Sequence, residues 1–198
     1  RDTHENAEKV WNKVLEDGEE FGLMVIAPAH HRRIAAGILS WGQDLDHETS
    51  PFQVNLAYQV PRNKKSDYIG KAELERQRDV MDSGEAPFKM KMVGITLGGK
   101  EITDYAPDFW LVADTDGNDI GYVTSPWWSP ELETNIALAW VPWSSSEVGT
   151  KLQVKLPDEY SVTPGEPVEA EVVDVPFRES VNPNKREVEA AKGKDFAE

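Results

Sequence analysis

Apolar residues recur with two different periods along this chain, helical near its start and strand-like beyond residue 85. The residues that share one helical face in the first segment are Ala7, Val10, Trp11, Val14 and Leu15. They predict an amphipathic helix over residues 3–17. Asp2 and Glu5 have the spacing of a capping box, and Gly18 follows as the expected end of the helix.

Two more helices and one strand are predicted before residue 85. Residues 23–27 are apolar and end at Pro28, which predicts a strand or a buried extended segment. Residues 29–39 predict a second helix, with Pro28 near its first turn. The polar segment 42–51 ends in Pro and is typical of a loop, and the charged segment 70–81 predicts a third helix.

The second half of the chain alternates apolar and polar positions in short segments separated by Gly and Pro. The predicted strands are residues 89–97, 109–113, 120–124, 135–141, 151–156 and 168–175. The alternation changes phase near Gly94, which predicts a bulge, and Asp116-Gly117 predicts a hairpin turn. Short strands in this arrangement predict a small antiparallel barrel or sandwich. The fold class is therefore α+β.

Composition excludes several classes of protein. The chain has 198 residues, 36 acidic against 21 basic side chains, and a formal charge of −15. This charge argues against a nucleic-acid-binding protein, which needs a basic face. No apolar run approaches the roughly 18 residues of a membrane helix. Because the chain has no Cys, thiolate metal sites and cysteine nucleophiles are excluded. We expect a cytoplasmic protein without nucleic-acid or membrane partners.

The segment His30-His31-Arg32-Arg33 is a first candidate for chemistry. Two adjacent His on a helix point about 100° apart, so they are poorly placed to chelate one metal ion. These residues are either polar surface groups, or one Arg faces a pocket and pairs with an anion. The second possibility suits the fork geometry of a guanidinium group.

Asp44, Asp46 and Glu48 alternate along the predicted loop at a spacing similar to that of a calcium loop. Thr49 and Asn55 stand where such a loop needs Gly and a bidentate Glu, so the sequence predicts no metal site. The loop is either a solvated acidic segment, or one of its carboxylates orients a substrate or a cofactor amide.

Trp127 and Trp128 are adjacent in a segment flanked by prolines, which predicts a turn. Two adjacent Trp on a turn cannot both point into one core, so they either pack between domains or one of them lines a cleft. A Gly-rich phosphate loop, a G-x-S-x-G elbow and an H-E-x-x-H helix do not occur in the sequence. Physical patterns alone thus predict an α+β protein with a β-barrel end and leave its function open.

An ordered series of short motifs resembles the glycine-cleavage T-protein (aminomethyltransferase) family. The motifs are Arg33-Ile-Ala-Ala-Gly37, Trp41-Gly-x-Asp44-Leu-Asp46-x-Glu48-Thr-Ser-Pro51, Tyr68-Ile-Gly-Lys71, Ile120-Gly-Tyr-Val-Thr-Ser125, Ser129-Pro-x-Leu132, Asn135-Ile-Ala137, Val141-Pro142, Gly149-Thr150 and Pro176-Phe177. Together they span roughly residues 5–178. The Trp-rich segment 125–129 looks closest to the tetrahydrofolate-dependent demethylase branch, such as dimethylsulfoniopropionate demethylases.

The resemblance implies a fold and a chemistry. Family members are three-domain cloverleaf proteins that hold tetrahydrofolate in a central channel, where N5 of the folate accepts a one-carbon unit. Residues 1–84 would be the remainder of the folate-binding α+β region, 85–178 the C-terminal barrel, and 179–198 a polar tail or surface helix. The chain would then be the C-terminal portion of a methyl or aminomethyl transferase or demethylase. Its substrate would be a small methylated sulfonium or amine.

The resemblance also assigns candidate cofactor-binding residues. Arg33 corresponds to the Arg of the family's R-x-E-A-G motif near the folate channel, and Trp41 to an aromatic position there. Trp127 and Trp128 correspond to a barrel loop that faces the same channel. Ala35 stands where the family has Glu, so the role of that carboxylate is lost or supplied elsewhere. Catalytic residues are expected in an upstream half, either a missing part of the same protein or a separate partner chain.

Two alternatives to an active transferase stay open on the sequence. One is a folate-binding relative without turnover, which is consistent with Ala35. The other is an interaction module of a larger dimethylglycine or sarcosine oxidoreductase complex. The iron–sulfur-assembly relatives carry a Cys-containing signature, so a chain without Cys does not resemble that branch.

Overall fold

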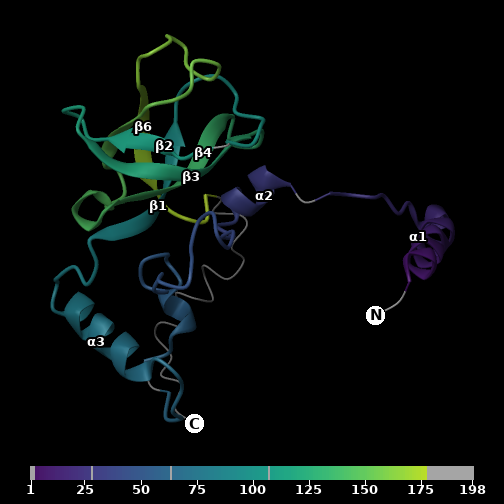
Figure 1. The fold of residues 1–198 in the computed structure, drawn as a ribbon, viewed down its shortest axis with the longest axis horizontal. Coiled ribbons are helices and arrows are strands. Elements are labelled where there is room, and N and C mark those ends of the chain that lie inside the picture. Colours follow the sequence, from purple (N-terminus) through teal and green to yellow (C-terminus); the bar gives the residue numbers. More distant parts are fainter. Residues whose placement is uncertain (1–2, 28, 63, 107, 178–198) are drawn as a thin grey trace.

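The computed structural model describes residues 3–27, 29–62, 64–106 and 108–177, and its main body is a β-barrel (Figure 1). The strands are β1 (Met90–Leu97), β2 (Trp110–Ala113), β3 (Asp119–Ser129), β4 (Thr134–Pro142), β5 (Lys151–Val154) and β6 (Val168–Val173). The α-helices are α1 (His4–Gly18), α2 (His30–Ala35) and α3 (Lys71–Asp82). Short 3-10 helices are η1 (Glu19–Phe21), η2 (Ala57–Gln59) and η3 (Trp143–Ser145). The predicted α+β class with a β-barrel is confirmed.

The barrel closes by antiparallel pairing throughout. Its strand order is β1-β4-β3-β2-β5-β6, and β6 returns to pair with β1. Alternate side chains of each strand point inward. The residues buried in the barrel core include Val93, Ile95, Leu97, Val112, Val123, Ala139, Val141, Val154 and Val172. The hairpin predicted at Asp116-Gly117 joins β2 to β3.

The prediction of a bulge near Gly94 is wrong. Strand β1 pairs with β4 residue by residue from Met90↔Pro142 to Leu97↔Asn135, without a register shift. The apparent change of phase arises because Gly94 lies on the outer face of the barrel, under other side chains. A Cβ atom there would lie 2.5 Å from Val175 Cγ2 and 2.9 Å from Phe177 Cζ. The register shifts instead between Val123 and Ser125 in β3, with a second irregularity in β2.

Strand β3 is longer than the predicted segment 120–124 because it continues through that shift to Ser129. Trp127 and Trp128 therefore lie on a strand that pairs with β4, and not on the predicted turn. Adjacent residues of a strand point to opposite faces, so the two indoles still cannot share one core.

The second helix is shorter than predicted. α2 ends at Ala35, whereas the sequence pattern predicts a helix over residues 29–39. Gly37 adopts a left-handed conformation with φ of 69°, and the Ile38 amide donates to the Arg33 carbonyl. A Cβ atom on Gly37 would lie 2.5 Å from Val175 Cγ1, so the close approach of Val175 favours glycine here.

The N-terminal arm, which we define as residues 3–27, stands apart from the barrel in Figure 1. The predicted amphipathic helix is confirmed as α1, and Thr3 is its N-cap, with Oγ1 accepting from the Asn6 amide. Asp2 of the expected capping box lies outside the described residues. Residues 23–27 are neither a strand nor buried, which contradicts the prediction. The reason is that no described element pairs with them.

The segment between α2 and β1 packs against one side of the barrel. The Met92 amide donates to the Gln53 carbonyl, and Asn55 Nδ2 donates to the Met92 carbonyl. The predicted third helix is confirmed as α3, and Gln77 on it accepts from the buried Ser50 hydroxyl. The predicted boundaries near residues 85 and 178 stay predictions. The tail 179–198 lies outside the described residues.

Candidate functional site

Arg33 and Asp44 form the polar centre of the contact between α2, the following loop and the barrel. Arg33 Nη1 donates to Asp44 Oδ2 at 2.9 Å and to the Ile38 carbonyl at 3.1 Å. Its Nη2 atom donates to Ser125 Oγ at 2.7 Å and lies 3.4 Å from the Gln43 amide oxygen. The guanidinium therefore joins the loop after α2 to strand β3.

The Asp44 carboxylate is the acceptor that organises this network. Its side chain is fully buried, and both oxygens receive hydrogen bonds. Oδ2 accepts from the Ser40 amide at 2.7 Å, and Oδ1 accepts from the Thr124 and Ser125 hydroxyls at 2.6 and 2.5 Å. A buried carboxylate is tolerated because its charge is paired and its lone pairs are satisfied.

Two more contacts fix the loop on the barrel. The Trp140 indole Nε1 donates to the Asp44 carbonyl at 2.9 Å, and Gln43 Nε2 donates to the Thr124 carbonyl at 2.7 Å. Thr124 and Ser125 belong to the part of β3 where the register shifts. Bulges commonly re-aim side chains, and this one lies where both hydroxyls reach Asp44. Asp44 is therefore not a solvated carboxylate, since its oxygens accept from groups of this chain, and a role of the loop in orienting a substrate or a cofactor amide stays a prediction.

An aromatic cluster lies at the start of α2, one helical turn before Arg33. The His30 ring stacks on Trp127 with centroids 5.1 Å apart and planes inclined by 24°. Tyr105 makes T-shaped contacts with both rings, and its hydroxyl is a hydrogen-bond partner of His30 Nε2. Burial and the nearby Arg33 guanidinium lower the pKa of His30 below its ordinary value, and Asp44 offsets part of this shift. We call His30, Tyr105 and Trp127 the aromatic cluster.

The four predicted cofactor-binding residues are only partly brought together. Arg33 lies in the polar network, and Trp127 lies in the aromatic cluster one turn away. Trp41 sits in the loop after α2 with 69% of its surface exposed. Trp128 is half-buried on the opposite face of β3, where its amide donates to the Ile102 carbonyl. Their assignment to cofactor binding stays a prediction.

The hollow beside the polar network is small. It is lined by Asp44, Tyr122, Phe109 and neighbouring residues and has a volume of about 150 Å³. Sites that enclose a drug-sized ligand measure about 300–1,000 Å³. Within the described ranges, no group of three or more His, Asp or Glu side chains is placed to hold a metal ion. No helix in that part of the chain is long and apolar enough to cross a membrane.

Comparison with known proteins places the barrel in a family. Residues 91–178 match the glycine cleavage T-protein C-terminal barrel domain. Over 175 residues the chain is 30% identical to an aminomethyltransferase of Geobacillus sp. (strain WCH70), a match that covers 87% of the chain and 43% of the relative. Its barrel is the C-terminal barrel domain of the glycine-cleavage T-protein family. The resemblance inferred from the short motifs is confirmed for the family; its demethylase branch stays a prediction.

Two further relatives agree with this assignment. An aminomethyltransferase of Thermotoga neapolitana is 34% identical over 178 residues, which cover 87% of this chain and 42% of that protein. A crystal structure of glycine cleavage system aminomethyltransferase T from Bartonella henselae superposes with a TM-score of 0.59 at 25% identity. That match covers 76% of this chain and 38% of the other. The T-protein family chain thus spans less than half the length of these relatives.

Sequence reasoning missed several partners of the site. Thr124 and Ser125 appear in the family motif, but their contact with Asp44 crosses about eighty residues of chain. Tyr105 lies in the segment between β1 and β2, and no motif around it in the sequence indicated a place in the site. The combination of a motif Arg, a motif Asp and adjacent motif hydroxyls is the one sequence clue that points to this network.

Proposed function

We propose that this chain is the C-terminal portion of a tetrahydrofolate-dependent one-carbon transferase, which acts together with an upstream T-protein-like part. Family membership carries the proposal: the relatives compared above are aminomethyltransferases, and residues 91–178 match the family's C-terminal barrel. These names favour a transferase over a module of an oxidoreductase complex. Methyl transfer from a small sulfonium or amine and a cytoplasmic location are further parts of the proposal.

The described residues fit one wall of a folate site. A pterin is a flat heteroaromatic ring, and the aromatic cluster offers the stacked edge and face contacts that such rings favour. The adjacent hollow of about 150 Å³ does not enclose a ligand of this size. The proposal therefore needs a second wall from the upstream part.

Each group of this wall has a definite task in the proposal. Tetrahydrofolate, when bound, supplies the N5 atom that accepts the one-carbon unit. Trp127 and His30 would exclude water from one face of the bound ring, and proximity in a dry site would account for much of the rate. The Arg33–Asp44 pair holds the loop that carries Trp41 at a fixed position against β3. Arg33 would act mainly through this loop, because four of its hydrogen bonds are internal.

Fluorescence titration of the complete protein with tetrahydrofolate tests the proposal. We expect saturable quenching of Trp emission, with a clear loss of affinity in Trp127→Phe. Trp143→Phe is the matched control, because Trp143 lies in η3 against Phe88 and Lys91, at the other end of β4. Formation of 5-methyltetrahydrofolate or 5,10-methylenetetrahydrofolate from methylated sulfonium, amine or aminomethyl donors identifies the reaction. No folate binding by the complete protein would contradict the proposal.

A further inference from the structure

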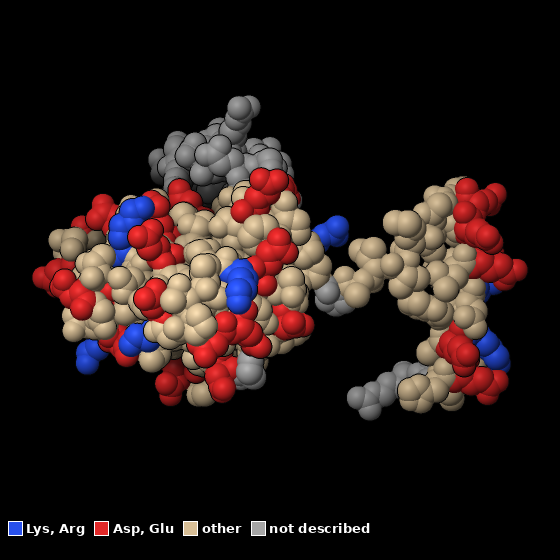
Figure 2. Space-filling view, turned by 90° about the horizontal axis from the view of Figure 1, so that it is seen from above, with Lys and Arg blue, Asp and Glu red and all other residues tan. Residues whose placement is uncertain are grey.

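The loop between β1 and β2 carries Tyr105 into the aromatic cluster, yet little holds its middle part. Among the described residues, the backbone of residues 103–106 makes no hydrogen bond, and Tyr105 is 65% exposed. Acidic side chains are spread over the main body in Figure 2, and Glu101, Asp104 and Asp108 of this loop make no ion pair with a described residue. Contacts outside this middle part must therefore set the position of Tyr105.

One buried side chain holds the part of the loop that precedes Tyr105. Asn135 on β4 is 1% exposed. Its Nδ2 atom donates to the Gly98 and Lys100 carbonyls at 3.3 and 2.9 Å, and its Oδ1 atom accepts from the Ile102 amide at 3.1 Å. A carboxamide combines donors and an acceptor, so one side chain can bind both kinds of backbone group. Asn135 thus binds alternate residues along one side of the loop.

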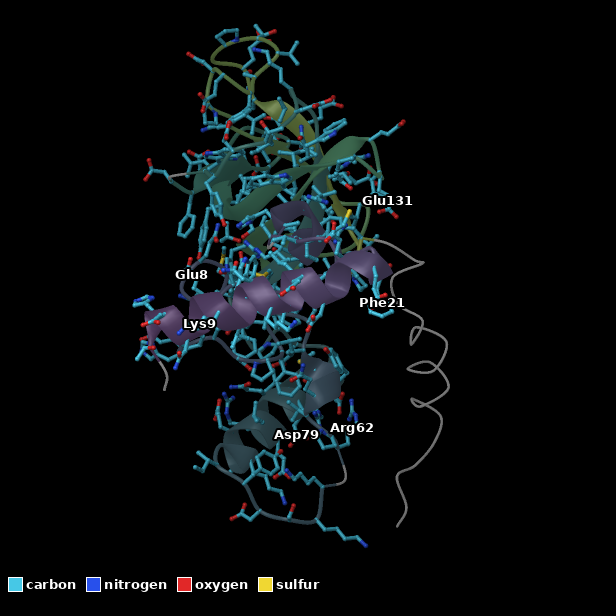
Figure 3. The ribbon with its side chains drawn as sticks, turned by 90° about the vertical axis from the view of Figure 1, so that its right-hand side faces the viewer. Glu8, Lys9, Phe21, Arg62, Asp79 and Glu131 are labelled. Carbon is cyan, nitrogen blue, oxygen red and sulfur yellow. The ribbon has the colours of Figure 1, made fainter. Side chains whose placement is uncertain are left out.

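The turn between β3 and β4 brings a second contact to the same place. Figure 3 shows Glu131 of this turn at the edge of the barrel. The two strands pair Trp128 with Asn135 across the turn. The Trp128 amide donates to the Ile102 carbonyl at 2.7 Å. Ile102 is therefore held from both strands, through its carbonyl by β3 and through its amide by β4.

Ile102 is the fixed point from which the loop reaches the aromatic cluster. Its side chain is fully buried in the barrel core. Three residues of chain span at most about 10 Å, so a fixed Ile102 confines Tyr105 to a small region. The neighbour of Trp128, Trp127, lies in that region. The centroid of the Tyr105 ring is 5.9 Å from that of Trp127 and 4.0 Å from that of His30.

We infer that Asn135 is a positioning residue for the aromatic cluster, which acts by fixing Ile102 and, through it, Tyr105. The loop has another anchor, in which the Lys100 amide donates to the Tyr160 carbonyl at 2.8 Å. That anchor comes before Ile102 and does not fix the residues that follow. The inference concerns the geometry of the cluster and needs no folate, whereas its consequence for folate binding rests on the proposed function.

The pKa of His30 reports whether Tyr105 is in place. Burial is the main cause that lowers this pKa, and the charges of Arg33 and Asp44 act on it as well. Asn135→Leu removes all three hydrogen bonds and adds no charge. We expect the pKa of His30, followed by NMR of its ring protons in the complete protein, to rise toward the ordinary value of about 6.5, because water reaches the ring when Tyr105 leaves it. An unchanged pKa would overturn the inference.

A milder variant and a control keep this test decisive. Asn135→Ser retains one hydroxyl donor and should raise the pKa of His30 by less, which covers the case in which Asn135→Leu does not fold. Val141→Ala is the matched control, because Val141 is fully buried at the other end of β4, where it pairs with Lys91. It should lower the stability of the barrel and leave the pKa of His30 unchanged. An equal rise in the control would overturn the inference, because lost stability alone would then explain it.

A double substitution separates positioning from a general loosening of the barrel. In a Tyr105→Ala background, Asn135→Ser should leave the pKa of His30 where Tyr105→Ala alone puts it, since both act through one contact. A further rise in that background would contradict a route through Tyr105. Tetrahydrofolate should bind about two- to tenfold more weakly to Asn135→Ser, the size expected for one aromatic contact. A shifted pKa with unchanged folate affinity would contradict only the proposed function.

Discussion

Strand β1 of the barrel and helix α1 of the N-terminal arm both carry a regular apolar face. In β1, the side chains of Val93, Ile95 and Leu97 are at most 3% exposed, whereas in α1 Val10 and Val14 are more than half exposed. The barrel strand has neighbours on both sides, β4 and β6. Helix α1 makes its main tertiary contacts with η1, the turn that directly follows it.

The comparison separates two meanings of an apolar pattern. A pattern tells which face is buried in the working protein, but it does not tell which layer buries it. The barrel buries its faces within itself because closure gives every strand two partners. In the arm, the same kind of apolar face is exposed in the part of the chain that the structure describes. Substitutions in the barrel should therefore change the unfolding free energy of the isolated chain much more than substitutions in the arm.

The largest effect is expected in the barrel core. Ile95 is fully buried, so Ile95→Ala should lower the free energy of unfolding by about 2–5 kcal/mol through lost burial and a cavity. Ile69→Ala is the matched control, because Ile69 is fully exposed, and it should stay within about 0.5 kcal/mol. Urea unfolding followed by circular dichroism measures both. Equal effects would show that the barrel core does not carry the stability.

The next effect concerns the joint between the barrel and the loop after α2. Asp44→Asn should cost about 3 kcal/mol, because it leaves Arg33 without its carboxylate and puts an NH2 group in place of an oxygen that accepts two hydrogen bonds. Asp119→Asn is the control: its pair with Lys155 at 2.6 Å is half exposed and should be worth less than about 1 kcal/mol. An Asp44→Asn variant as stable as the natural chain would mean that the network is not formed in solution.

A close backbone approach predicts a somewhat smaller effect. A Cβ atom on Gly121 would lie 2.1 Å from the Trp140 carbonyl oxygen, so Gly121→Ala must push β3 from β4 and should cost about 1–3 kcal/mol. At Gly98 the nearest atom to a Cβ is 3.7 Å away, and Gly98→Ala should be nearly neutral. Thermal unfolding compares the two. A neutral Gly121→Ala variant would contradict the β3/β4 register.

A small pH effect is expected at the aromatic cluster. The folded state lowers the pKa of His30, so the unfolded chain binds a proton more readily. Stability should therefore fall as the pH drops below the ordinary His pKa of about 6.5. Unfolding free energies at pH 7 and pH 5 should differ less in His30→Gln than in the natural chain. His47→Gln, in an exposed loop, is the control and should show the same stability difference between the two pH values as the natural chain. A smaller difference in His47→Gln than in His30→Gln would contradict the packing of His30 in the aromatic cluster.

The smallest effect is expected in the N-terminal arm. Val14→Ala should change the stability of the isolated chain by less than about 0.5 kcal/mol, because the side chain is 53% exposed and Ala favours helix. Chemical unfolding with both Trp emission and circular dichroism measures the change. A loss above about 1 kcal/mol would show that α1 already has a partner within this chain, which would erase the contrast between the two regions.

Local pattern predicted the existence of elements better than their ends. The barrel strands and the helices α1 and α3 were predictable because each has a clear period. The end of α2 was not, because it depends on Val175, which packs on Gly37 from the far end of the chain. The length of β3 was not either, because its pairing with β4 carries it through Pro126 to Ser129.

The candidate site shows the same division. Arg33 and Asp44 were singled out separately, one as an anion-pairing group and the other as a possible orienting carboxylate. Their pairing with each other and with Ser125 required the loop and β3 to meet in space. The stacking of His30 on Trp127 likewise joins residues from α2 and β3, and no spacing in the sequence reports it.

The sequence by itself determined which faces are apolar, where the Asp-Gly hairpin turns, and, through its ordered motifs, the family. These features are local, because side-chain period and turn chemistry act over a few residues. Only the tertiary structure decided that β6 closes the barrel on β1 and that Arg33 donates its hydrogen bonds within the Asp44 network. It also decided that the apolar side chains of the arm are exposed among the described residues. Those outcomes depend on which distant segments meet, and a local pattern carries no information about distance across the chain.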